Sequence, residues 1–174
     1  MTRWVALLRG VNVGGITVRS APLAELFREL GFTQVVTVLA TGNVVFDAAE
    51  DAATMKPLIE SALTERFGYE AWIVLVTQAE IARRAEEFPF AEDEATQPYL
   101  LFGSDEAVLD ELFAAARALE SAVERIARGP GLLYWSLPTG RSTNSPVAKL
   151  VARARYRSTT TNRSLRTVRR IAAA

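Results

Sequence analysis

The stretch Trp4-Val-Ala-Leu-Leu-Arg-Gly-Val-Asn-Val-Gly-Gly15 joins an apolar run to a loop of Arg, Asn and glycine. The run Trp4–Leu8 predicts a buried strand that carries this polar loop to one edge of a sheet. Loops of this kind serve sites more often than cores, because they bring backbone donors and a cation to a place that a ligand can reach.

Downstream, the pattern alternates between helical and strand periods. Helical spacing follows Ser20, which we expect to cap a helix that Gly31 ends. A second helical pattern has its apolar face from Met55 to Phe67 and ends at Gly68. Beta-branched runs and the turn Ala40-Thr-Gly-Asn43 predict a hairpin. The predicted strands are Trp4–Leu8, Val35–Leu39, Val44–Phe46 and Trp72–Val76. The order βαββαβ is that of the ferredoxin-like plait.

A second set of elements follows a joining segment. We expect a short helix over Ala79–Glu87 and an acidic loop over 88–98, and then strands and helices in the same order. The predicted elements are a strand Tyr99–Phe102, a helix Ala107–Leu119, strands Ala122–Ala127 and Leu132–Ser136, a helix from Ser145 to about Arg153, an edge strand Thr159–Thr161 and a helix Leu165–Ile171. The predicted fold class is α+β, with two ferredoxin-like alpha-beta plait units in tandem: residues 1–77, a connection 78–98 and residues 99–174. One continuous mixed sheet stays an alternative.

Composition narrows the chemistry. The 174 residues include no Cys and no His. Disulfides, thiolate chemistry, Ser-His-Asp triads and Cys/His zinc sites are therefore excluded. An enzyme would have to use carboxylates, Lys, Arg, Tyr, hydroxyls or a hard metal. The cluster Glu92-Asp93-Glu94 lacks further ligands, so we expect a solvated loop and no metal site. The sequence leaves the question of a cofactor open. We expect a cytoplasmic protein without a signal peptide or a membrane span.

Charge is divided unevenly along the chain. Residues 1–124 carry nine Lys and Arg against twenty Asp and Glu, whereas residues 125–174 carry eleven Lys and Arg and no acid. The basic part must face a polyanion or lie against acids of its own chain. We favour pairing with Glu86, Glu87, Glu92, Asp93 and Glu94 over contact with nucleic acid. Two polar clusters, 140–144 and 159–163, lie in this part, and donors of the first could hold a phosphate.

The plait predicts where the polar loops meet. Its first two strands are parallel and the third lies antiparallel between them, so the loop after the first strand and the turn before the third share an edge. The residues expected there are Arg9, Asn12, Gly14, Gly15, Thr41, Gly42 and Asn43, with Arg163 from the basic part as a possible addition. Such a set could recognise an anion or an amide. The alternative is that the glycines permit a tight turn and the asparagines satisfy backbone groups.

These residues also carry a resemblance. Ala6-Leu-Leu-Arg-Gly-Val-Asn-Val-Gly-Gly15, Leu30-Gly-Phe32 and Thr41-Gly-Asn-Val-Val-Phe46 resemble a bacterial family known as domain of unknown function 1697. The resemblance continues through Pro89-Phe90, Leu133-Tyr-Trp135 and Gly140-Arg-Ser142. It implies a small cytoplasmic protein with two plait units, and it implies no particular reaction or catalytic residue.

The leading functional hypothesis is binding of a small anionic or phosphate-bearing ligand at the edge formed by Arg9–Gly15 and Thr41–Asn43. One alternative is an enzyme of unknown reaction at the same place, although neither loop carries a carboxylate. Another alternative is nucleic-acid binding through the last fifty residues, which would weaken steeply with salt. Whether the protein is an enzyme, and its oligomeric state, stay open at the level of sequence.

Overall fold

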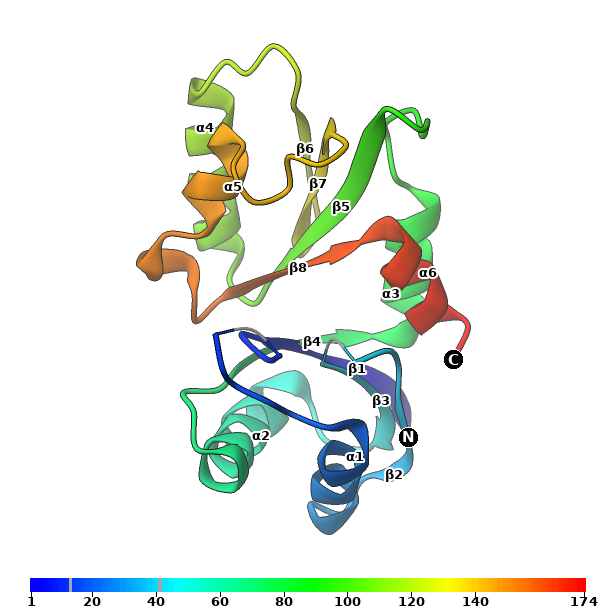
Figure 1. Cartoon of the computed structure of the whole chain (residues 1–174). Helices are drawn as coiled ribbons and strands as arrows, with labels where there is room; N and C mark the ends of the chain where they lie inside the picture. Colours follow the sequence, from blue (N-terminus) through cyan, green and yellow to red (C-terminus); the bar gives the residue numbers. More distant parts are fainter. Residues whose placement is uncertain (13, 41) are drawn as a thin grey trace.

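The computed structural model describes residues 1–12, 14–40 and 42–174, and it contains two similar units joined by a helix (Figure 1). The elements of the first unit are β1 (Thr2–Arg9), α1 (Ser20–Glu29), β2 (Thr33–Thr37), β3 (Asn43–Ala48), α2 (Ala52–Phe67) and β4 (Trp72–Thr77). The joining helix is α3 (Gln78–Glu86). The elements of the second unit are β5 (Thr96–Gly103), α4 (Glu106–Ala118), β6 (Arg125–Gly129), β7 (Leu132–Pro138), α5 (Pro146–Val151), the short 3-10 helix η1 (Ala154–Tyr156), β8 (Thr160–Ser164) and α6 (Leu165–Ala172).

Each unit contains a four-stranded antiparallel sheet with the same strand arrangement. The orders are β2-β3-β1-β4 and β6-β7-β5-β8, so the first strand of each unit lies in the middle of its sheet. This is the plait order, and it confirms the α+β prediction with two units in tandem. The two sheets stay separate, so the alternative of one continuous mixed sheet is wrong.

The alternation of side chains along β1 shows how the layers are built. Ala6 and Leu8 pack with α1 and α2 on the outer face of the first sheet, whereas Val5 and Leu7 face the second unit. A separate core joins the second sheet to α4 and α5. The inner faces of the two sheets, together with α3 and α6, therefore enclose a third apolar core between the units (Figure 1).

Glycine ends both helices of the first unit at the expected places. Gly68 adopts φ +67° at the end of α2, and Gly31 follows the last residues of α1 with φ +90°. The prediction that Ser20 caps α1 is wrong, because the N-cap residue is Arg19. Arg19 is the extended N-cap residue and its carbonyl accepts a hydrogen bond from the Leu23 N–H, so Ser20 is already helical.

Three strands of the second unit depart furthest from their predicted bounds. β5 begins at Thr96, inside the predicted loop, and includes Pro98. Pairing with β8 starts only at Tyr99, so the missing N–H of Pro98 interrupts no ladder on that side. β6 covers Arg125–Gly129, not Ala122–Ala127, and β8 extends to Ser164 beyond the predicted Thr161. The extension of β8 places Arg163 in a strand that faces the first unit.

Candidate functional site: a cleft between the two units

The end of β1 and the turn before β3 lie side by side. Leu7 is the register partner of Asn43, and the Leu8 N–H donates to the Gly42 carbonyl at 2.8 Å. Gly42 is buried in this contact with φ +75°, and a Cβ at this position would lie 2.6 Å from Val11 Cγ2. Only glycine fits both the backbone conformation and the space. Thr41, which the sequence places in the same turn, lies outside the described residues.

Asn12 shapes the loop that follows β1. Its Oδ1 accepts from the Val18 N–H at 3.0 Å, and its Nδ2 donates to the Ala40 carbonyl. Both ends of the amide are therefore engaged within the protein. Gly14 and Gly15 are exposed and have φ values of +59° and +86°, a region that glycine adopts without strain. Asn12 and these glycines hold the loop in shape, whether or not a ligand contacts them.

Arg163 reaches from β8 into this corner and is buried there. Its Nε donates to Asn43 Oδ1 at 2.6 Å, and its Nη2 donates to the carbonyls of Leu8 at 2.6 Å and Gly42 at 3.2 Å. Its Nη1 donates to Thr161 Oγ1 and to the Asn162 carbonyl. Burial lowers the pKa of Arg163 to about 10. All five donors are used, so Arg163 joins the units and has no free N–H for a ligand.

Arg9 is the last residue of β1 and is engaged on one side only. Its Nη1 donates to the carbonyl and the Oγ1 of Thr160, at 2.7 and 2.9 Å. Within the described parts of the chain, no carboxylate lies within ion-pair distance of Arg9, and its Nε and Nη2 have no partner. Burial lowers the pKa of Arg9, and repulsion by the Arg157 guanidinium lowers it further. Arg9 is thus a half-buried cation without a counterion among the described residues.

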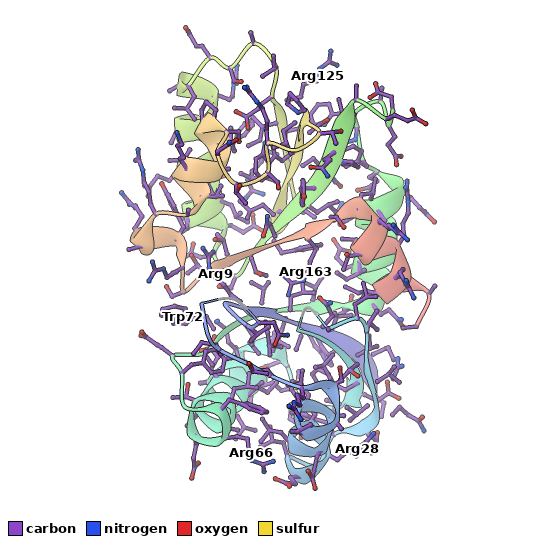
Figure 2. All side chains as sticks on the ribbon, in the orientation of Figure 1. Arg9, Arg28, Arg66, Trp72, Arg125 and Arg163 are labelled. Atoms are coloured by element: carbon purple, nitrogen blue, oxygen red, sulfur yellow. The ribbon has the colours of Figure 1, made fainter. Side chains whose placement is uncertain are left out.

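A cleft of about 560 Å³ opens beside Arg9, between the end of β1, the edge strand β8 and helix α5. Figure 2 shows Arg9 and Arg163 in the seam between the two units. The polar side chains of the lining, called here the polar side, are those of Arg9, Ser142, Thr143, Thr161, Asn162 and Arg163. The apolar side chains of the lining, called here the apolar wall, are those of Leu8, Val11, Leu101, Ala148, Val151 and Ala152. None of the described residues that line it is acidic. The volume is within the range of sites for small organic molecules.

Helix α5, which carries much of the apolar wall, is fixed by polar groups. Ser145 caps it by accepting from the Ala148 N–H at 3.1 Å. The buried Glu124 accepts from the Val147 N–H with one oxygen and from Trp135 Nε1 with the other. The wall of the cleft is therefore held by the core of the second unit and does not depend on a ligand.

The structure joins predicted site residues with others that the sequence did not single out. Gly42, Asn43 and Arg163 meet in one corner, where Arg163 donates to the other two. The polar groups of Asn12 are engaged by Val18 and Ala40, and Arg9 donates to Thr160. The apolar wall and Arg157 were missed. The clusters 140–144 and 159–163 were the available signal, since Ser142, Thr143 and Asn162 come from them.

The basic C-terminal part is only partly paired with acids. Among the described residues, Arg128, Arg155 and Arg169 form ion pairs, with Glu106 and Asp110, with Glu111 and with Glu92. Of the acids expected to neutralise this part, Glu92 does so, whereas Glu87 pairs with Arg84. Seven further cations have no carboxylate partner among the described residues: Arg125, Arg141, Lys149, Arg153, Arg157, Arg166 and Arg170.

Two further properties of the described residues bear on the class of protein. No helix in the described ranges is long and apolar enough to cross a membrane. Within the same ranges, no group of three or more acidic side chains could hold a metal ion.

Comparison with known proteins places the fold in a family. The chain belongs to the family described as "Protein of unknown function (DUF1697)", whose model matches residues 1–134. A conserved bacterial protein from Streptococcus pneumoniae has a similar solved structure, with a TM-score of 0.82 and 24% sequence identity over 99% of this chain and 97% of that one. Among curated proteins, none matches the sequence. The similarity of the two structures establishes the fold and leaves the activity to be inferred from the cleft.

Proposed function

We propose that this protein binds a small anionic, phosphate-bearing molecule in the cleft between its two units, with Arg9 as the principal contact. The carrying observation is Arg9 in the lining of the cleft: its guanidinium is half-buried, engages Thr160 through one nitrogen and has no carboxylate partner among the described residues. Partial burial of a cation without a counterion costs free energy, and an anion bound beside Arg9 would offset that cost. The charge of Arg157 acts in the same direction, since it also lowers the pKa of Arg9.

The remaining polar side fits the same kind of ligand. Thr160 fixes one nitrogen of Arg9, so its other nitrogens can form the paired hydrogen bonds that guanidinium makes with phosphate or carboxylate oxygens. Ser142, Thr143 and Asn162 add hydroxyl and amide donors along the cleft. In this proposal the residues that support the end of β1 are Asn12, Gly14, Gly15, Gly42, Asn43 and Arg163.

The lining of the cleft favours binding over catalysis. Its described residues include no carboxylate, Lys or Tyr, the groups left for acid–base chemistry in a chain without His and Cys. An enzymatic reaction at the same site would need such a group from the ligand or from a second ligand.

Isothermal titration calorimetry with inorganic phosphate and pyrophosphate tests this proposal. We expect both anions to bind, and Arg9→Gln to weaken them by tenfold or more, the usual cost of losing a charge-assisted pair of hydrogen bonds. Arg28→Gln, an exposed cation of α1, is the matched control and should change nothing. Trp72 is the register partner of Arg9, so its fluorescence offers a second signal (Figure 2). Absence of binding, or equal affinity for Arg9→Gln and the unmodified protein, would refute the proposal.

Nucleic-acid binding is a second proposal, supported by the seven unpaired cations of the basic C-terminal part. Binding of this kind falls steeply with salt, with a slope that follows the number of phosphates contacted. Fluorescence anisotropy with a labelled oligonucleotide at 50 and 200 mM salt separates it from binding of a small anion, since the single cleft contacts few phosphates.

A further inference from the structure

We infer that the ligand of the cleft is a small organic phosphate whose organic part is apolar, with the phosphate at Arg9 and the apolar group against the apolar wall. This inference rests on the proposed function, because it extends the same cleft beyond the anion itself. Its starting point is the mixed lining of the cleft, in which a set of apolar side chains lies beside the polar ones.

The size of the cleft calls for more than an inorganic ion. Its volume of about 560 Å³ far exceeds the space of a phosphate group, which is a few times the roughly 30 Å³ of a water molecule. Beyond the phosphate, a ligand would extend along α5, where the small side chains of Ala148 and Ala152 are one helical turn apart and leave room.

The chemistry of the wall determines which organic group fits that room. Val11, Leu101 and Val151 offer no side-chain hydrogen bond, so a sugar or glycerol hydroxyl placed there would lose water without compensation. An apolar group at the same place removes its own surface and that of the wall from water. The wall therefore selects against polar phosphate esters as well as for apolar ones.

The two sides can be tested separately because each has one residue that can be changed alone, Arg9 in the first unit and Ala152 in the second. Arg9 lies at the end of β1, whereas Ala152 follows the last residue of α5 and is exposed. Ala152→Trp fills the space along the wall from a position whose side chain the core does not need. Ala114→Trp, an exposed alanine on α4, is the matched control for the added indole.

The experiment measures the affinities of inorganic phosphate, glycerol 3-phosphate and phenyl phosphate by calorimetry. We expect phenyl phosphate to bind at least tenfold more tightly than the other two. Ala152→Trp should remove that advantage and leave inorganic phosphate unchanged, Arg9→Gln should weaken all three, and Ala114→Trp should weaken none.

The outcomes distinguish this inference from the proposed function. If inorganic phosphate binds through Arg9 but phenyl phosphate binds no better, or Ala152→Trp leaves its advantage intact, the apolar part of the inference is wrong and the anion site stands. If none of the three compounds binds, the proposed function and this inference both fail.

Discussion

Arg163 is a cation buried without an anion. Its charge is balanced by carbonyl and amide oxygens of Leu8, Gly42 and Asn43, which belong to the other unit. Burial of a guanidinium is costly, and it is tolerated here because every N–H has an acceptor. The acceptors of Leu8, Gly42 and Asn43 therefore depend on the Arg163 side chain for these hydrogen bonds.

Replacement of Arg163 should therefore destabilise the whole protein. We expect Arg163→Met to lower the free energy of unfolding by about 2 kcal/mol or more, because Asn43 and the Leu8 carbonyl lose their buried donor. Urea denaturation followed by circular dichroism measures the change. The control Arg166→Met removes an exposed cation of α6 and should stay within about 0.5 kcal/mol. Equal midpoints for the two variants would contradict this account.

At the scale of the element, the turn before β3 depends on the backbone of Gly42. An added Cβ would meet Leu8 and Val11 below van der Waals distance, in addition to the strain of a positive φ. Gly68 has a comparable φ at the end of α2, but nothing lies within 4 Å of the position of its Cβ. Substitution at Gly68 therefore introduces conformational strain alone, whereas substitution at Gly42 introduces strain and steric overlap.

This comparison gives a second stability prediction. Gly68→Ala should lower the free energy of unfolding by about 1 kcal/mol, the cost of a left-handed conformation for alanine. Gly42→Ala should cost clearly more, because Val11 or Leu8 must move as well. Guanidinium denaturation of both variants checks the order, and similar losses for the two would show that the corner relaxes without cost.

Elements with a clear hydrophobic period could be predicted from the sequence. The bounds of elements that depend on pairing with a neighbouring strand were predicted less accurately. The side chains of β1 alternate between two apolar cores, and glycines mark the ends of α1 and α2. These elements could therefore be predicted from the local sequence. β8 reads Thr-Thr-Asn-Arg-Ser and becomes a strand only because it pairs with β5. The convergence of the polar loops followed from plait topology. The burial of Arg163 and the approach of Arg157 to Arg9 depend on how the units pack, which no local pattern encodes.

At the scale of the molecule, α3 and α6 pack against each other and help to close the core between the units. Glu92, in the connection after α3, forms two hydrogen bonds with Arg169 of α6, at 2.7 and 2.8 Å. The hydrogen bonds from Arg169 lower the pKa of the Glu92 carboxyl below its ordinary value of 4.5. The pair is exposed, so its contribution is small.

The pH dependence of this pair has a defined sign. A carboxyl whose pKa is lowered by folding stabilises the fold above its ordinary pKa, and this contribution is lost as the pH falls through the lowered value. Glu92→Gln should cost roughly 0.5 kcal/mol or less at pH 7, and the difference from the unmodified protein should shrink toward pH 3. Urea denaturation at both values measures it. Glu94→Gln, whose carboxylate has no ion pair among the described residues, should show no such change.

The position of Arg163 near the end of the chain also has a consequence for biosynthesis. The ribosome synthesises the first unit long before β8, so the Leu8 carbonyl stays exposed to water until the Arg163 guanidinium reaches it. The apolar inner face of the first sheet, which includes Val5, Leu7, Val45 and Val74, is exposed to water over the same period. A nascent chain that has emerged only as far as residue 98 should therefore expose apolar surface of the first unit and bind chaperones. Emergence of residues 160–174 should then complete the packing of both units together.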